Sequence, residues 1–354
     1  MSETLGVLDG LSVPIVQAPL AGGASTPALA AAVSESGGLG FVAAGYKTPE
    51  DLRANIAATV KLTSRPFGVN VFVPDVGPAG EETVRPYVKS LEAESAAAGV
   101  ALGEPRFDDD GWDEKLAVLV EDPPAVVSFT FGSPPAGVVG RLQDAGAQVW
   151  VTVTDPAEAR EAAATGANAL VVQGAEAGGH RASFIDTDDR DELGLLAAIQ
   201  LVKAAVDLPL VATGGIATGA GVAAVLAAGA SAAQVGTAFM RCPEAGTAGA
   251  HREALSSSTR TGYTRAFSGR LARGIVNRFQ SEHSADAPRA YPEVHHVTAP
   301  LRAHARETGD LDVLHLWAGQ AHELAREEPA AEVVARLAGE ARAALDAAAP
   351  RLGP

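Results

Sequence analysis

The strongest constraint on the fold is a regular alternation of short β-branched runs with longer alanine-rich stretches, which continues to about residue 240. Such alternation is typical of βαβ units and a parallel sheet. Eight runs have the composition of strands, and eight strands close a (β/α)8 TIM barrel. An open doubly wound sheet is the alternative, because the rhythm alone does not show closure. The eight runs are Val13–Gln17, Leu39–Ala43, Phe67–Phe72, Val126–Phe131, Val149–Val153, Ala169–Gln173, Leu208–Thr213 and Ala233–Gly236.

Helix boundary signals lie between these runs. Thr48 and Asp155 each stand directly before a proline, the order expected of an N-cap residue and the first helical position. Gly166 and Gly229 follow alanine-rich stretches and precede the next strand, where glycine commonly ends a helix in the left-handed conformation. These signals support the predicted order of strand and helix.

The chain is expected to have two parts. Residues 1–240 would form the barrel, and residues 241–354 a smaller lid and C-terminal helical region, with its share in completing the barrel left open. The segment 74–124 is longer than one crossover needs, and its acidic run Asp108–Asp110 is predicted to be a solvated loop. Helical spacing of apolar residues predicts a packing helix over 332–345.

Composition excludes several classes of function. A net charge of −16 disfavours binding to nucleic acid or to an anionic membrane surface. The N-terminus has no basic and apolar leader, and no apolar stretch reaches the roughly 18 residues of a membrane span. With Cys242 as the single cysteine, no internal disulfide forms and no thiolate metal site is expected. We therefore expect a cytoplasmic protein without a bound metal.

The residues that follow the predicted strands carry the chemistry, because barrel active sites lie at the carboxyl ends of the strands. Gly214 and Gly215 follow the seventh strand and Gly236 ends the eighth. Glycines there let backbone N–H groups approach a phosphate, although tight βα turns also need glycine. No G-x-G-x-x-G follows the first strand, which weighs against a Rossmann dinucleotide site. A phosphate-bearing cofactor is the predicted ligand.

His180 is the candidate catalytic residue, since it follows two glycines beyond the sixth strand and titrates near neutral pH. The other histidines are weaker candidates: His295 and His296 would face opposite ways on a strand, and His304, His315 and His322 are expected on surface helices. Arg265, Arg270 and Arg273 lie close together, either in a solvated basic loop or in a site, and their role is left open.

At these residues the chain resembles the nitronate monooxygenase family, formerly called 2-nitropropane dioxygenases. The resemblance rests on Glu176-Ala177-Gly178-Gly179-His180-Arg181, Ala212-Thr213-Gly214-Gly215-Ile216, Gln234-Val235-Gly236-Thr237 and Phe267-Ser268-Gly269-Arg270 together. It implies an FMN-binding barrel, with a smaller domain over the flavin, in which His180 abstracts the α-proton of a nitroalkane or orients its nitronate. The implied FMN contacts are Pro19, Leu20, Ala21, Asn70, Gln173, Gly178, Gly214, Gly215, Gln234, Val235, Gly236 and Thr237.

The implied reaction is oxidation of an alkyl nitronate with dioxygen to a carbonyl compound and nitrite. Its partners are then a small nitronate or nitroalkane and dioxygen, and homo-oligomer formation is left open. Where relatives often continue the histidine motif with glycine, this chain has Ala182-Ser183, which puts the shape of the substrate pocket in doubt. An FMN- and NAD(P)H-dependent enoyl-acyl-carrier-protein reductase is the alternative, because it shares the barrel and a similar Gly-Gly-His motif. A flavin-binding protein without turnover is the second alternative.

Overall fold

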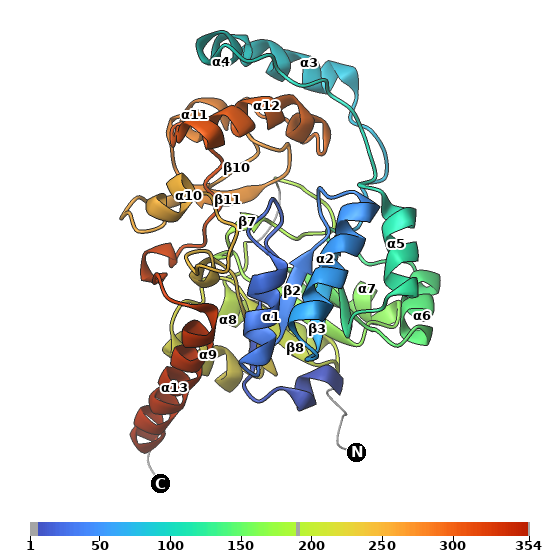
Figure 1. Ribbon diagram of the computed structural model, residues 1–354, viewed down its shortest axis with the longest axis vertical. Coiled ribbons are helices and arrows are strands. Elements are labelled where there is room, and N and C mark those ends of the chain that lie inside the picture. The colour runs from blue at the N-terminus through green and yellow to red at the C-terminus, as the bar shows by residue number, and fades with distance from the viewer. Residues whose placement is uncertain (1–5, 189–191, 353–354) are drawn as a thin grey trace.

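The computed structural model describes residues 6–188 and 192–352 (Figure 1). Eight parallel strands form one sheet in the order β1-β9-β8-β6-β5-β4-β3-β2. A bridge between Val16 and Leu39 joins β1 to β2, which closes the sheet into a (β/α)8 barrel and makes the open-sheet alternative wrong. All eight predicted strands are confirmed: β1 (Ile15–Gln17), β2 (Gly40–Ala43), β3 (Phe67–Phe72), β4 (Val126–Thr130), β5 (Gln148–Val153), β6 (Ala169–Gln173), β8 (Leu210–Thr213) and β9 (Ala232–Val235).

Helices surround the barrel, and the residues predicted to begin and end them do so in the structure. The Thr48 hydroxyl accepts the N–H of Asp51 at 3.1 Å, and the Asp155 carboxylate accepts that of Ala157 at 2.7 Å. Gly166 and Gly229 have φ of 95° and 105°, the left-handed values expected after a helix end. The outer helices are α1 (Pro27–Glu35), α2 (Pro49–Leu62), α5 (Trp112–Glu121), α6 (Ala136–Asp144), α7 (Pro156–Ala164), α8 (Leu195–Ala205), α9 (Gly219–Ala227) and α13 (Ala330–Ala348).

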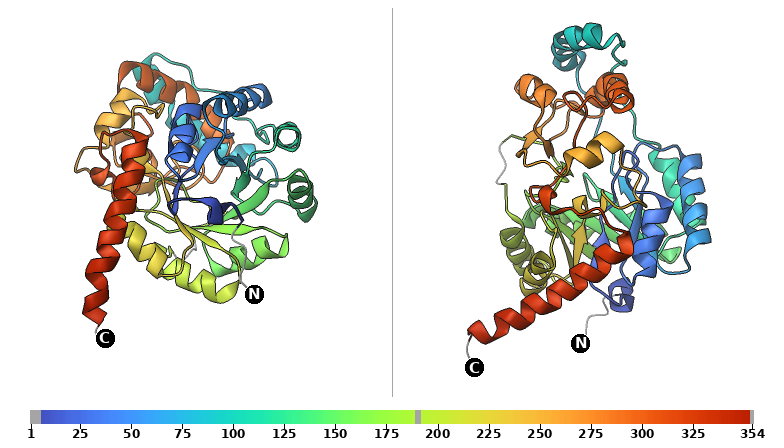
Figure 2. Two further views of the ribbon diagram at one scale, coloured as in Figure 1. Left: turned by 60° about the horizontal axis from the view of Figure 1, so that its bottom comes forward. Right: turned by 60° about the vertical axis from the view of Figure 1, so that its left-hand side comes forward.

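Apolar side chains fill the barrel interior. Phe41 and Trp150 are fully buried there, with ring centroids 6.0 Å apart. Leu8 of the 3-10 helix η1 (Gly6–Gly10) belongs to the same cluster, so η1 closes the amino-terminal end of the barrel (Figure 2). With that end filled by described residues, the cavity of the barrel lies at the carboxyl ends of the strands.

A second, smaller body covers those carboxyl ends, and we call it the cap. It consists of α3, α4, α10, α11 and α12 with the three-stranded sheet β10-β11-β7 (Figure 1). One apolar cluster runs through it and includes Tyr87, Phe267 and Phe279, so the cap takes residues from the 74–124 segment as well as from the chain after 240. The domain boundary at 240 stays a prediction. The bounds are α3 (Glu81–Ser90), α4 (Glu92–Ala98), β7 (Gly179–His180), α10 (Gly249–Ala254), β10 (Thr261–Thr264), β11 (Ala272–Ile275), α11 (Arg278–His283) and α12 (Glu293–Thr308), with 3-10 helices η2 (Thr237–Phe239), η3 (His322–Leu324) and η4 (Ala349–Leu352) elsewhere.

Helix α13 lies on the outside of the barrel, against α9 and α1 (Figure 2). Val333, Leu337 and Ala341 are buried in the barrel's outer core, whereas Leu345 is 44% exposed. The Glu340 carboxylate accepts the N–H of Gly219, the first residue of α9, at 2.9 Å. The predicted packing helix is therefore confirmed up to Ala341, and Leu345 lies beyond the contact.

The acidic run is not a simple solvated loop, contrary to the sequence prediction. Asp110 forms an ion pair with the fully buried Lys115 at 2.7 Å and accepts the backbone N–H of Tyr46 at 3.0 Å. Asp108 lies 2.6 Å from His296 of the cap. Asp110 therefore stabilises the barrel rim, and Asp108 links the rim to the cap. Across the described parts of the chain, no helix is long and apolar enough to span a membrane.

Candidate active site

A cavity lies at the carboxyl ends of the strands, and every barrel strand or the loop after it contributes lining residues. The structure brings nearly all of the predicted site residues to this one cavity. Val235 is the exception, since its side chain is 1% exposed and packs in the core between barrel and helices. The predicted residues that line the cavity are Pro19, Leu20, Ala21, Asn70, Gln173, Gly178, His180, Gly214, Gly215, Gln234, Gly236 and Thr237.

The glycine-rich end of the cavity is formed by the loops after β8 and β9. Gly214 and Gly215 have φ of 127° and 66°, a conformation that L side chains rarely adopt. No hydrogen-bond acceptor among the described residues takes the backbone N–H of Gly215 or of Thr237. These two free amide donors, one in the loop that leads into α9 and one at the first residue of η2, make this end suitable for a phosphate.

The loop after β1 forms an apolar wall of the cavity and is fixed by buried polar contacts. Gln17 accepts the N–H of Phe41 at 2.8 Å through Oε1, and its Nε2 donates to the Ser25 hydroxyl at 3.0 Å. The same hydroxyl accepts the N–H of Leu20 at 2.8 Å. Pro19, Leu20 and Ala21 are therefore held in place before any ligand binds.

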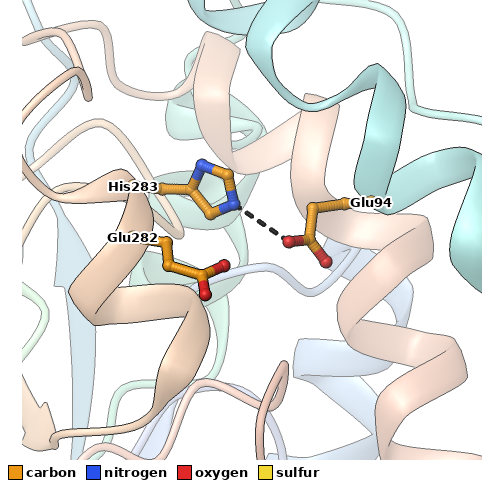
Figure 3. A group of neighbouring side chains, drawn as sticks. All are labelled: Glu94, Glu282 and His283. Carbon is orange, nitrogen blue, oxygen red and sulfur yellow. Dashed lines mark hydrogen bonds and ion pairs between the residues drawn. The ribbon is translucent and has the colours of Figure 1, made fainter.

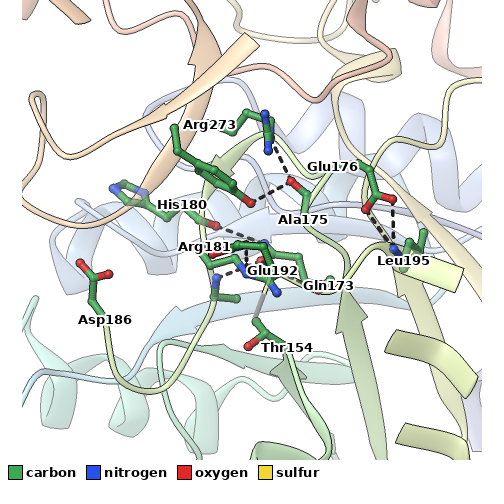
Figure 4. Close-up of polar contacts among 12 residues, drawn as sticks. Thr154, Gln173, Ala175, Glu176, His180, Arg181, Asp186, Glu192, Leu195 and Arg273 are labelled. Atoms are coloured by element: carbon green, nitrogen blue, oxygen red, sulfur yellow. Dashed lines mark hydrogen bonds and ion pairs between the residues drawn. The ribbon is translucent and has the colours of Figure 1, made fainter. Parts of the chain in front are cut away.

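Asn70 and Gln173 are oriented by neighbours. The Asn70 amide nitrogen donates to the Ser128 and Thr130 hydroxyls at 3.0 Å each, so its carbonyl oxygen stays available on the cavity side. Gln173 donates to the carbonyl of His180 at 3.1 Å, and its Oε1 accepts from Arg181 at 3.1 Å (Figure 4). These contacts tie Gln173 to the histidine loop, so its remaining N–H is what it can offer a ligand.

His180 lies on the two-residue strand β7, which pairs with β11 of the cap. Its imidazole points away from the Gln173–Arg181 contacts (Figure 4), and its Nε2 lies 2.8 Å from the Ser268 hydroxyl. Burial, together with the positive charges of Arg270 and Arg302, lowers the pKa of His180 from 6.5 to about 3. The ring is therefore neutral near pH 7, with a pKa well below the near-neutral value expected from the sequence.

Aromatic rings surround the imidazole of His180, and none of them was assigned a role from the sequence. Its ring centroid lies 5.6 Å from those of Phe131 and Trp317 and 5.8 Å from that of Tyr291. Tyr46 extends this wall, because its hydroxyl lies 3.4 Å from that of Tyr291. Tyr46 and Trp317 also line the cavity beside the imidazole.

The three arginines left open in the sequence are already paired, with Arg270 and Arg273 buried and Arg265 partly buried. Arg265 binds Asp186 through two hydrogen bonds of 2.7 and 2.8 Å. Arg270 is stacked 4.0 Å over the Phe131 ring, and Arg273 donates to the carbonyl of Ala175 at 2.9 Å (Figure 4). They stabilise the β7–β11 region around His180, which makes a solvated basic loop the wrong reading.

Most of the remaining histidines are not placed as the sequence predicted, although His304 does lie on a helix, α12, with its side chain partly exposed. His295 and His296 lie on α12, not on a strand, and His295 stacks on Tyr46 at 4.2 Å. His315 lies in a loop that lines the cavity, not on a surface helix, and burial lowers its pKa well below 6.5. His322 is 2% exposed in η3, where it contacts the carbonyls of Leu255 and Thr259. Cys242 is fully buried, and burial raises the pKa of its thiol to about 12.

Glu94, Glu282 and His283 are the one group in the described residues with spacing suited to a metal ion (Figure 3). Arg278 already neutralises it, with contacts of 2.6 Å to Glu94 and 2.7 Å to Glu282. These pairs hold the pKa of Glu94 at about 2 and join α4 to α11. The group is therefore an ion-pair network inside the cap.

Comparison with known proteins agrees with this geometry. The chain matches the family described as Nitronate monooxygenase over residues 7–340. A nitronate monooxygenase from Pseudomonas aeruginosa is 43% identical, over 97% of this chain and 100% of that protein. The chain belongs to the nitronate monooxygenase family. A second nitronate monooxygenase, from Paraburkholderia phytofirmans, is 40% identical over 96% of this chain and 95% of its own.

Solved structures separate the nitronate monooxygenase family from the reductase alternative. A nitroalkane oxidase from Streptomyces ansochromogenes is 50% identical and superposes with a TM-score of 0.94, covering 96% of this chain and 99% of that one. FabK from Thermotoga maritima is 27% identical, with a TM-score of 0.75 and 96% coverage of both chains. An enoyl reductase domain of MlnA from Bacillus amyloliquefaciens, 12% identical with a TM-score of 0.66 over 97% of both chains, shares the fold. The reductase alternative is not favoured.

Proposed function

We propose that the cavity binds FMN and that the protein oxidises alkyl nitronates, and the nitroalkanes that give rise to them, with dioxygen. The proposal depends on one cavity that combines two features. Its glycine-rich end offers free amide donors, and elsewhere it is lined by a neutral histidine with aromatic neighbours. When bound, FMN supplies the redox chemistry, and the products are a carbonyl compound and nitrite. The protein supplies binding, orientation and exclusion of water.

The residues present fit FMN. Its phosphate would be held by the N–H groups of Gly215 and Thr237, whose lack of a protein acceptor is what such a ligand requires. The flavin ring would lie against the fixed wall Pro19–Ala21, with the Asn70 carbonyl oxygen and the free N–H of Gln173 as polar partners. A cavity with one phosphate-sized end and no adenosine-binding fingerprint favours FMN over FAD.

His180 would act on the substrate beside the flavin. At neutral pH its imidazole is uncharged, since burial and nearby guanidinium groups oppose its protonation. The α-proton of a nitroalkane is acidic because the nitro group delocalises the resulting charge, so a positioned base suffices to form the nitronate. The Phe131, Tyr291 and Trp317 rings would give the substrate apolar surfaces next to the imidazole.

Purified protein tests both parts of the proposal. Heat-released cofactor is identified by chromatography, with FMN expected and FAD or no flavin contradicting the assignment. The loaded protein is then mixed without oxygen with a preformed nitronate or with NADPH. Bleaching by the nitronate, followed by nitrite formation in air, supports the proposed reaction. Rapid bleaching by NADPH alone would favour the reductase instead. A cytoplasmic location and homo-oligomer formation stay predictions.

A further inference from the structure

Ser268 is the hydrogen-bond partner that the structure gives to His180. The His180 Nε2 atom lies 2.8 Å from Ser268 Oγ, and Ser268 is 2% exposed. The backbone of His180 is fixed independently by its pairing with Ala272 on β11. The imidazole Nδ1 has no hydrogen-bond partner among the described residues, and the side chain lines the cavity. The two ring nitrogens therefore have different surroundings.

The surroundings of Ser268 decide which ring nitrogen carries the proton. A serine hydroxyl has one hydrogen to donate and two lone pairs to accept with. Ser268 Oγ lies 3.2 Å from the carbonyl oxygen of Arg270, which can only accept, and 3.5 Å from the backbone nitrogen of Arg270, which can only donate. Within the described chain, no other donor reaches that carbonyl. The single hydroxyl hydrogen is thus needed for Arg270.

The opposite arrangement is worse. If Ser268 donated to His180 instead, the Arg270 carbonyl would be left without a donor in a buried region, and two oxygens would face each other at 3.2 Å with no hydrogen between them. An unsatisfied buried acceptor costs more than a satisfied one gains. When the Ser268 hydroxyl donates to the Arg270 carbonyl, Ser268 Oγ can only accept a hydrogen bond from His180. The His180 Nε2 atom therefore carries the imidazole hydrogen.

We propose that Ser268 is a positioning residue that fixes neutral His180 as its Nε2–H tautomer and so presents Nδ1 to the substrate as a base. This inference rests on the proposed function. The Nδ1 lone pair takes the α-proton of the nitroalkane, the C–H bond breaks, and its electron pair stays on the substrate as the nitronate. His180 becomes an imidazolium that still donates through Nε2 to Ser268. The transferred proton then lets Nδ1–H donate to the nitronate oxygen.

This tautomer distinguishes two roles for His180. Neutral His180 with a bare Nδ1 cannot donate a hydrogen bond to a nitronate, so its first act is proton abstraction. The charged groups that act on the imidazole are Arg270 and Arg302, which favour the neutral ring, and Asp186, which opposes them. Turnover of a preformed nitronate therefore depends less on the tautomer than turnover of a neutral nitroalkane does.

The first test is nitrogen NMR of the histidine side chains in the FMN-loaded protein at pH 7, with the His180 signals assigned by their loss in His180→Gln. We expect a protonated Nε2 and an unprotonated Nδ1. An Nδ1–H tautomer would overturn the proposal. This measurement needs no substrate, so it stands even if the protein fails to oxidise nitronates, which would refute the proposed function alone.

The second test uses Ser268→Ala, with Ser268→Thr to restore the hydroxyl. Ser34→Ala is the matched control, because Ser34 is equally buried and bonds the carbonyl of Pro66 at 2.8 Å far from the cavity. We expect Ser268→Ala to give mixed tautomers and to lower kcat for a neutral nitroalkane by about tenfold, the usual size for one hydrogen bond. Preformed nitronate should change little, and Ser268→Thr should recover both readouts. A folded Ser268→Ala protein with the Nε2–H tautomer and an unchanged rate ratio would refute the role.

Discussion

Replacing Gly215 with aspartate tests the phosphate site most directly. Gly215 has φ of 66°, where an L residue costs roughly 1–2 kcal/mol. An added Cβ would lie 2.9 Å from the Glu176 Cβ, and Glu176 is itself fixed by the N–H of Leu195 at 3.0 Å. We therefore expect Gly215→Asp to lower the free energy of unfolding by about 2 kcal/mol, which a domain of this size survives.

The charge adds a separate effect on FMN binding. A carboxylate about 5 to 6 Å from a phosphate costs about 3 kcal/mol per pair of unit charges at an effective dielectric constant near 20, or about 10²-fold in Kd. Gly215→Asn has the same shape without the charge and isolates this term. Gly309→Asp is the control for strain, since Gly309 has φ of 74° with no atom within 4 Å of its added Cβ.

Flavin fluorescence during titration of cofactor-free protein measures Kd, and thermal unfolding without flavin measures stability. We expect Gly309→Asp to lose stability but to keep the wild-type Kd. Gly215→Asn should weaken FMN moderately and Gly215→Asp about 10²-fold further. Equal Kd values for the two Gly215 variants would refute the charge reasoning. A folded Gly215→Asp protein with the wild-type Kd would move the phosphate elsewhere.

Three further predictions follow from the site and its supports. Turnover of a neutral nitroalkane by FMN-loaded His180→Asn should fall by about 10² to 10⁴, and turnover of a preformed nitronate much less, whereas equal losses would indicate positioning only. Burial lowers the pKa of His251 to about 4 and of His295 to about 2, so their contribution to stability is present above pH 6.5 and lost as the pH falls. The free energy of unfolding should fall by about 1 kcal/mol for each of these two histidines between pH 7 and pH 5.5. Equal midpoints of urea unfolding at the two pH values would contradict this. Lys115→Met should lower stability by about 2 kcal/mol because it leaves Asp110 without its buried cation, and adding Asp110→Asn should recover part of the loss in thermal unfolding.

The barrel could be predicted from the sequence because its signals are local. A strand buried on both faces is a short run of apolar residues, as in β3 and β6. A helix N-terminal residue such as Thr48 bonds only to its next few neighbours in the chain. The cap could not be predicted in the same way. Its sheet joins Gly179–His180 to a strand that begins at Ala272, and its core takes Tyr87 from a distant segment.

In the active site, too, residues with local sequence signals were predicted and residues brought together from distant segments were not. Gly214 and Gly215 after β8 were found because their positive φ values demand glycine, whereas Gly236 after β9 has φ of −109° and was found from its place at the end of the strand. The partners of His180 were missed because Phe131, Tyr291 and Trp317 come from three separate loops and carry no local pattern. His315 was misplaced because a helix was assumed where the chain folds back into the cavity. Val235 was included as a motif neighbour, although alternation along a strand turns its side chain to the core.

The position of α13 has a consequence for the order in which the chain can fold during synthesis. The helix covers α9 and α1, which flank the seam where β9 and β1 meet, and it follows the whole cap in the chain. Until it emerges from the ribosome, the apolar faces of α1 and α9 that will receive Val333 and Leu337 have no cover. This face of the barrel thus remains exposed to aggregation or to chaperones until residues 330–348 have been synthesised, and a truncation before α13 would leave it uncovered.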